Sequence, residues 1–262
     1  MRALHTAATG MMAQELNVQV ISNNIANMRT TGYKRQRAEF QDLLYEHVNR
    51  VGTQTSSQGN ILPAGIELGS GVKTVGTPRL MTQGALVQSG KDYDLAIRGA
   101  GFFKILLPDG RTAYSRDGSF ELDAQGRLVT AQGNVVQPGI TIPQNATSVA
   151  INSQGQVSVT VPGSTTPTSV GQIELSIFIN QAGLQSMGDN LYLETPASGA
   201  PQDGTPSTDG FGNLQQGFLE QANVEAVSEI SDLIAAQRAY EMNAKVITAA
   251  DQMLSATSQL MR

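Results

Sequence analysis

The sequence predicts an α+β fold: an antiparallel β-rich middle domain, flanked by N- and C-terminal amphipathic helices that pair in a coiled-coil-like assembly domain. Three observations predict it. Apolar residues recur at helical spacing near both ends of the chain. Short β-rich runs between these ends alternate with turn signals, such as PDG at 108–110 and RDG at 116–118. Proline is absent from Phe218 to Arg262, so nothing in that stretch interrupts a long helix.

Residues 1–28 predict the first helix, because steps of three, four or seven separate the apolar residues Leu4, Ala8, Met11, Val18, Ile21, Ile25 and Met28. Near the end of this helix, polar amide side chains stand where apolar core residues are expected, at Asn23, Asn24 and Asn27. A buried amide left unpaired costs about 1–3 kcal/mol, so these amides can fix the alignment of packed helices. The alternative is that they only fray and cap the helix before Gly32.

The second helix is predicted near the C-terminus, where steps of four and three alternate along Ala226, Ile230, Leu233, Gln237, Tyr240, Ala244, Ile247, Asp251, Leu254, Ser258 and Met261. Neither helix can bury its whole apolar stripe against one partner, so other copies of the chain are expected to supply the rest. The predicted subunit-assembly residues are Leu4, Met11, Val18, Ile21, Asn23, Asn24, Ile25, Asn27, Ile230, Leu233, Gln237, Tyr240, Ala244, Ile247 and Leu254.

The middle of the chain predicts strands at 94–107, 127–142, 149–151, 156–161 and 172–178. The predicted domains are therefore a β-rich outer domain at 76–209 and a discontinuous assembly domain at 1–33 and 222–262. An extended connecting segment at 34–75 and 210–221 joins them. Residues 49–71 and 196–213 are rich in Gly and polar residues, which is typical of loops and extended chain.

The chemistry of the chain argues against an enzyme. It has no cysteine, which excludes disulfides and thiolate metal sites, and its two histidines, His5 and His47, lie far from any nucleophile motif. Gly99 and Gly101 begin a G-x-G-x-x-G pattern that fails at Lys104, so a turn between strands is expected there. We expect no catalytic, cofactor-binding or metal-binding residue, and no cofactor.

Charge and hydropathy restrict the partners. The net charge of −5 gives no strong attraction to nucleic acid or to an anionic membrane over the whole molecule. No run reaches the roughly 18–20 apolar residues that span a bilayer, so no membrane insertion is expected. The N-terminus lacks the continuous apolar core of a cleavable signal peptide, which leaves the cytoplasm or export by another route. The basic residues Lys34, Arg35 and Arg37 predict a solvated or subunit-pairing face, with Glu39 and Asp42 nearby.

Two long motifs resemble those of a known family. SNNIANMRTTGYKR at 22–35 and NVEAVSEISDLIAAQRAYEMNAKVITAADQML at 223–254 resemble the terminal signatures of flagellar axial proteins, the rod and hook subunits of the bacterial flagellum. The stretch from Ala96 to Pro138 is similar to the β domain of that family. Met28-Arg29 and the region from Thr160 to Thr168 depart most from the family pattern.

Chain length and the segment from Leu44 to Gly65 resemble the distal-rod member of this family. The resemblance implies a structural subunit that polymerises into a rigid, hollow periplasmic drive shaft and transmits motor torque to the hook. It implies as partners further copies of the chain, proximal-rod and hook subunits, the surrounding L- and P-ring proteins and the flagellar type III export apparatus. The alternatives are a proximal-rod or hook subunit of the same family, or a non-flagellar β-rich adhesin or tail-type structural protein.

Overall fold

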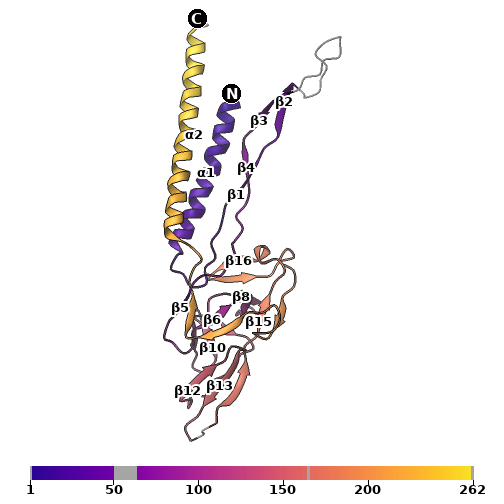
Figure 1. Cartoon of the computed structure of the whole chain (residues 1–262), viewed down its shortest axis with the longest axis vertical. Helices are drawn as coiled ribbons and strands as arrows, with labels where there is room; N and C mark the ends of the chain where they lie inside the picture. The colour runs from indigo at the N-terminus through magenta and orange to yellow at the C-terminus, as the bar shows by residue number, and fades with distance from the viewer. Residues whose placement is uncertain (1, 50–63, 164–165, 261–262) are drawn as a thin grey trace. The chain divides into compact units, whose positions relative to one another are not determined.

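The computed structural model describes residues 2–49, 64–163 and 166–260 (Figure 1). The chain forms two compact units. The helical unit comprises Met1–Ile25, Gln36–Pro78 and Glu225–Arg262, and the β unit comprises Ala26–Arg35 and Arg79–Val224. Each unit is therefore built from segments that are distant in sequence.

Both predicted terminal helices are present, and they pack against each other in the helical unit. Helix α1 spans Arg2–Ala26 and helix α2 spans Ala226–Leu260. Glu229 lies in the first turn of α2, where a negative charge favours helix formation. Figure 1 shows the two helices side by side, with the N-terminus of one and the C-terminus of the other at the same end.

The helical unit also contains two antiparallel strand pairs. Strand β1 (Glu39–Asp42) pairs with β4 (Val72–Gly76), and β2 (Tyr45–Asn49) pairs with β3 (Ile66–Gly69). Every residue of β2 and β3 is exposed. Most of the segment from Leu44 to Gly65, which resembles the distal-rod member of the family, lies in sequence between these two strands. Residues 50–63 are outside the part of the chain that the structure describes.

The β unit holds the remaining strands, and all of their pairings are antiparallel. A nine-stranded sheet runs in the order β16, β17, β8, β7, β11, β10, β9, with β15 joining β7 to β18. A three-stranded sheet runs β12, β13, β14, and two further pairs are β19 with β6 and β20 with β5. The strands are β5 (Leu86–Gln88), β6 (Leu95–Arg98), β7 (Phe102–Leu106), β8 (Thr112–Ser115), β9 (Phe120–Leu122), β10 (Leu128–Thr130), β11 (Val135–Val136), β12 (Ser148–Ile151), β13 (Gln156–Thr160), β14 (Thr168–Gln172), β15 (Leu175–Ile177), β16 (Gln185–Gly188), β17 (Leu191–Leu193), β18 (Gln202–Gly204), β19 (Asn213–Gln216) and β20 (Phe218–Glu220).

The hydrophobic core of the β unit comes from alternate residues of these short strands. Phe103 and Phe120 meet edge to face with ring centroids 5.0 Å apart, in a cluster with Leu95, Leu128 and Leu175. A second, aromatic cluster contains Phe102, Tyr114, Phe178, Leu184 and Tyr192, and burial raises the pKa of Tyr114 to about 12. The antiparallel β-rich middle predicted from the sequence is confirmed.

Candidate subunit-assembly interface

The antiparallel register of α1 and α2 follows from two contacts. A Cβ atom added at Gly10 would lie 2.9 Å from Nδ2 of Asn243, and Nδ2 of Asn24 donates a hydrogen bond of 3.1 Å to Oε2 of Glu229. Gly10 and Asn24 are two heptads apart, and so are Glu229 and Asn243. A heptad repeat therefore relates the two helices, as in a coiled coil.

Small and polar residues face each other in the contact between the helices, which we call the seam. Continuing the register places Ala3 opposite Ala250 and Asn17 opposite Ala236. Both alanines of α2 are buried, as are Ala7, Ala13, Val20 and Ile21 of α1. Because the spacing of packed helices depends on side-chain size, alanine and glycine at these positions let the two backbones approach closely.

Asn24 links three segments of the helical unit. Only 1% of this residue is exposed. Its Nδ2 donates to the carbonyl oxygen of Gln36 at 2.8 Å, and its Oδ1 accepts from the backbone N–H of Gln36 at 3.0 Å. Its bond to Glu229, which is fully buried, adds a contact with α2. Asn24 thus fastens the chain after α1 and the start of α2 to the end of α1.

The neighbouring asparagines lie in different environments. Asn23 is exposed on α1. Asn27 is half-buried in the β unit, where its backbone oxygen accepts from the N–H of Thr30 at 3.0 Å and its Oδ1 accepts from Oγ1 of Thr30 at 3.2 Å. These two bonds close the turn that follows α1. The three amides therefore lie in three different environments.

The predicted assembly residues fall into three classes of exposure, and their role between subunits stays a prediction. Ile21 and Asn24 are buried in the chain. The half-buried residues are Leu4, Met11, Val18, Ile25, Asn27, Leu233, Ala244 and Ile247. The exposed residues are Asn23, Ile230, Gln237, Tyr240 and Leu254.

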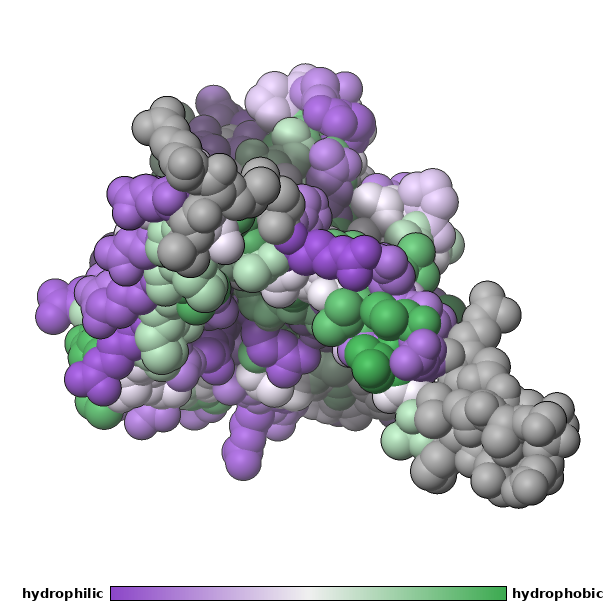
Figure 2. All heavy atoms as spheres, turned by 90° about the horizontal axis from the view of Figure 1, so that it is seen from above, coloured by the Kyte–Doolittle hydropathy of each residue, from purple (hydrophilic) through white to green (hydrophobic). Residues whose placement is uncertain are grey.

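The side of α2 that faces away from the seam carries large apolar residues. Val227, Ile230, Ile234 and Met242 are all exposed, with Val227 at 73% and Met242 at 60%. At about 100° per residue these four positions fall on one face, opposite Ala236 and Ala250. We call them the outer face of α2. Figure 2 looks onto the end where α1 begins and α2 ends, and hydrophobic residues reach the surface there among hydrophilic ones.

Sequence reasoning included Ile21 and Asn24 but missed the small residues of the seam, because it followed the large apolar residues. Positions 229, 236, 243 and 250 of α2 are Glu, Ala, Asn and Ala, and positions 3, 10, 17 and 24 of α1 are Ala, Gly, Asn and Asn. A search for small and polar residues repeating every seven positions in both helices would have found it.

The sequence interpretation of Lys34 as a solvated or subunit-pairing residue is wrong, because Lys34 is only 1% exposed. Its Nζ donates to Oε1 of Glu220 at 2.6 Å and to the carbonyl oxygen of Thr82 at 2.9 Å. Arg116, also buried, donates from Nε to Oε2 of Glu220 at 2.9 Å. We call Lys34, Arg116 and Glu220 the ion cluster. Lys34 and Glu220 lie far apart in sequence, so no local pattern pointed to it.

The ion cluster is fully hydrogen-bonded around its single carboxylate. Oε1 of Glu220 also accepts from the backbone N–H of Gly84 at 2.9 Å, and Arg116 donates to the carbonyl oxygens of Gly99 and Gly101. Burial lowers the pKa of both Lys34 and Arg116, and the charge of Glu220 opposes that shift. The carboxylate of Glu220 therefore compensates two buried cations.

The structure agrees with two local sequence expectations, which concern Arg37 and the residues from Gly99 to Gly101. Arg37 forms an exposed ion pair of 2.7 Å with Glu39. Gly99 to Gly101 connect β6 to β7, as expected for a turn. Among the described residues, no group of three or more His, Cys, Asp or Glu side chains could hold a metal ion. Neither helix, over its described length, combines the length and apolar character needed to cross a bilayer.

Three family models match the chain. Residues 4–34 match the flagella basal body rod protein family, residues 96–159 match the flagellar hook protein FlgE/F/G D1 domain, and residues 215–260 match the flagellar basal body rod FlgEFG protein C-terminal domain. The matched regions include α1, the core strands of the β unit and α2. They define the class as an axial protein of the flagellar rod and hook.

Individual relatives refine this class. The flagellar basal-body rod protein FlgG of Caulobacter vibrioides is 58% identical over 99% of both chains, and FlgG of Agrobacterium fabrum is 49% identical over 99% of both. The rod protein FlgF of Caulobacter vibrioides is 36% identical over 94% of this chain and 91% of its own. The chain belongs to the family of the flagellar basal-body rod protein FlgG. It is a structural subunit of the flagellar basal-body rod.

Proposed function

We propose that the chain polymerises into the distal rod, a rigid and hollow periplasmic drive shaft that transmits motor torque to the hook. Membership of the FlgG family supports the rod, and the greater identity to FlgG than to FlgF in Caulobacter vibrioides supports the distal member over another rod protein. The relatives compared above are rod proteins, and none of them supports the adhesin or tail-type alternative.

The observation that carries the proposal is the outer face of α2. The seam leaves Val227, Ile230, Ile234 and Met242 outside, although burying one such side chain stabilises a contact by about 1.5–3 kcal/mol. At the same spacing Arg238 and Lys245 also fall on this face, so it is an apolar patch within a mixed surface, and exposed apolar patches mark interaction sites. Every copy presents the same face, and a heterologous contact repeated with rotation and rise generates a helical polymer.

The remaining partners follow from the proposed position in the flagellum. A distal rod joins proximal-rod subunits at one end and hook subunits at the other, passes through the L- and P-ring proteins, and is built from subunits delivered by the flagellar type III export apparatus. We assign assembly to residues 1–33 and 222–262, connection to 34–75 and 210–221, and the outer surface to 76–209. The connecting role of residues 34–75 is supported by the β2–β3 pair, because all of its residues are exposed and available to neighbouring copies.

Ile230→Asp is expected to abolish rod assembly while leaving the β unit folded, because it places a charge in the middle of the proposed contact. Electron microscopy of basal bodies isolated from cells that express only the variant measures assembly. The matched control is Ile179→Asp, since Ile179 is a still more exposed isoleucine (83%) in the β unit. Normal rods from the Ile230 variant would contradict the proposal.

Asn24→Ala is expected to reduce rod assembly without unfolding the β unit. The substitution removes two bonds to the backbone of Gln36 and one to Glu229, leaving buried polar groups unpaired at about 1–3 kcal/mol. Asn23→Ala is also expected to reduce assembly, since Asn23 is exposed on α1.

Circular dichroism at 222 nm measures the effect of Asn24→Ala on the fold of the helical unit. The helical signal of this variant should melt at a lower temperature than that of the unmodified chain, because the substitution removes hydrogen bonds to Gln36 and Glu229. Normal rods in both variants would show that these amides have no role in assembly.

A further inference from the structure

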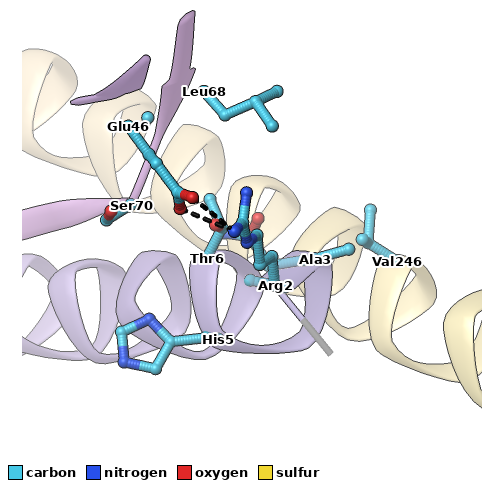
Figure 3. A pocket seen from close by; sticks show the side chains of 11 residues that line it. Arg2, Ala3, His5, Thr6, Glu46, Leu68, Ser70 and Val246 are labelled. Carbon is cyan, nitrogen blue, oxygen red and sulfur yellow. Dashed lines mark hydrogen bonds and ion pairs between the residues drawn. The ribbon is translucent and has the colours of Figure 1, made fainter. Parts of the chain in front are cut away.

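An unfilled cavity lies where α1 begins. Its volume is about 620 Å³, and α1, α2 and the β2–β3 pair all contribute to its lining. Figure 3 shows Ala3 from α1, Val246 from α2 and Leu68 from β3 around it. Leu68 and Val246 are both partly exposed as the chain stands. The cavity is thus an apolar recess at one end of the helical unit.

The charged residues at this recess are already paired with each other. Arg2 of α1 forms an ion pair of 2.6 Å with Glu46 of β2, drawn as dashed lines in Figure 3. His5 points away from this pair in the same view. An apolar occupant could therefore enter without burying an unpaired charge, which would be costly.

Helix α2 is longer than its partner and extends past it. The register that places Ala250 opposite Ala3 leaves Gln252–Leu260 beyond the start of α1, and Figure 1 shows α2 continuing past the N-terminus. We call this stretch the overhang. Leu254, seven residues after Ile247, lies on the same side of α2 as the seam. Its side chain is 40% exposed, because α1 has no residue among those described that lies opposite it.

The overhang cannot fill the recess of its own chain. Asn243 and Val246 of the same α2 already line that recess, and the helix continues from them without interruption to Leu260. A continuous helix cannot fold back on itself within two turns. The overhang sequence, QMLSATSQL, has no charged side chain. An uncharged segment suits the recess, because Arg2 and Glu46 there already neutralise each other.

We propose that the overhang of α2 from one copy of the chain occupies the recess of a second copy, with Leu254 packed against Leu68, Ala3 and Val246. This contact rests on the proposed polymerisation and specifies one of its interfaces. Donor and acceptor are different surfaces of the same molecule, so the contact is heterologous and extends from copy to copy. It is separate from the outer face of α2.

Cysteine crosslinking tests this contact directly, because the chain has no cysteine of its own. Leu68→Cys and Leu254→Cys are made as separate single variants and co-expressed, so that a crosslink between them must join two copies. Basal bodies are isolated, oxidised and analysed on denaturing gels. A strong band at the mass of two chains is expected from the mixture, and only weak bands from either variant alone.

Two control mixtures make the result specific. Leu254→Cys mixed with Ile179→Cys, which is exposed on the β unit, should give no strong dimer band. Leu68→Cys mixed with Met242→Cys tests whether the outer face of α2 fills the recess instead. A dimer with Met242→Cys in place of Leu254→Cys, or equal dimer yields in all mixtures, would overturn the proposal.

The isolated basal bodies also show whether a negative result concerns the recess contact alone or the proposed polymerisation on which it rests. If rods assemble normally and the Leu68–Leu254 dimer is absent, only the recess contact is wrong. If the unmodified chain is absent from the isolated rods, the proposed polymerisation is wrong. As a second measurement, Leu254→Asp should reduce the amount of assembled rod by about tenfold or more, because it removes the burial of one leucine.

Discussion

Glu220→Gln is expected to lower the free energy of unfolding of the β unit by about 3–5 kcal/mol, which is the largest single-residue effect that we predict. The substitution keeps the size of the side chain but removes the carboxylate that forms ion pairs with both Lys34 and Arg116. Both cations would remain buried. Urea denaturation followed by near-ultraviolet circular dichroism measures the loss, since Tyr114 and Tyr192 are buried in this unit.

A matched control and a second substitution test the physical reason. Glu121→Gln removes an exposed carboxylate of the same unit, 68% exposed and 3.9 Å from Lys91, and should cost no more than about 1 kcal/mol. Adding Lys34→Met to Glu220→Gln should recover part of the lost stability, because it removes one uncompensated charge. Equal losses from Glu220→Gln and Glu121→Gln would show that the buried charges are not the cause.

Gly32→Ala is expected to destabilise the β unit by about 3 kcal/mol or more, the second largest effect. Gly32 has φ of +67°, a conformation that L-residues adopt at a cost. An added Cβ would also lie 2.6 Å from the backbone nitrogen of Asp117, which cannot move as a flexible side chain could. The N–H of Gly32 donates to the carbonyl oxygen of Glu220, so the disturbance reaches the ion cluster.

Gly110→Ala isolates the conformational part of this cost. Gly110 has φ of +85° in the same unit, but an added Cβ there meets nothing within 4 Å. This control should lose only about 1–2 kcal/mol in the same urea experiment. If both variants lose the same amount, the close approach to Asp117 contributes nothing.

The fold was predictable from the sequence because helical spacing and turn chemistry are local signals. Apolar steps of three and four located both helices, and β-rich runs between turn signals located part of the strands of the β unit. At Asp123, the carboxylate accepts the N–H groups of Gln125 and Arg127, which is the turn geometry that such sequences favour.

The contacts between distant segments were less predictable, for two physical reasons. The helix pair closes through Gly10, Ala236 and Ala250, and a pattern of apolar residues gives little weight to such small side chains. The ion cluster depends on the pairing of β20 with β5 and on the path of the chain after α1. Lys34 looks like any surface lysine until those segments are placed together.

The polar positions of the α1–α2 contact also have a mechanical consequence. Sliding one helix along the other by a heptad would move it about 10 Å and place Glu229 opposite Asn17, while Asn24 would lose its carboxylate partner. Smaller displacements would push Asn243 into side chains larger than the hydrogen of Gly10. A shaft that transmits torque needs subunits that keep their internal alignment, and in this chain two amides and a glycine oppose the sliding of one helix along the other.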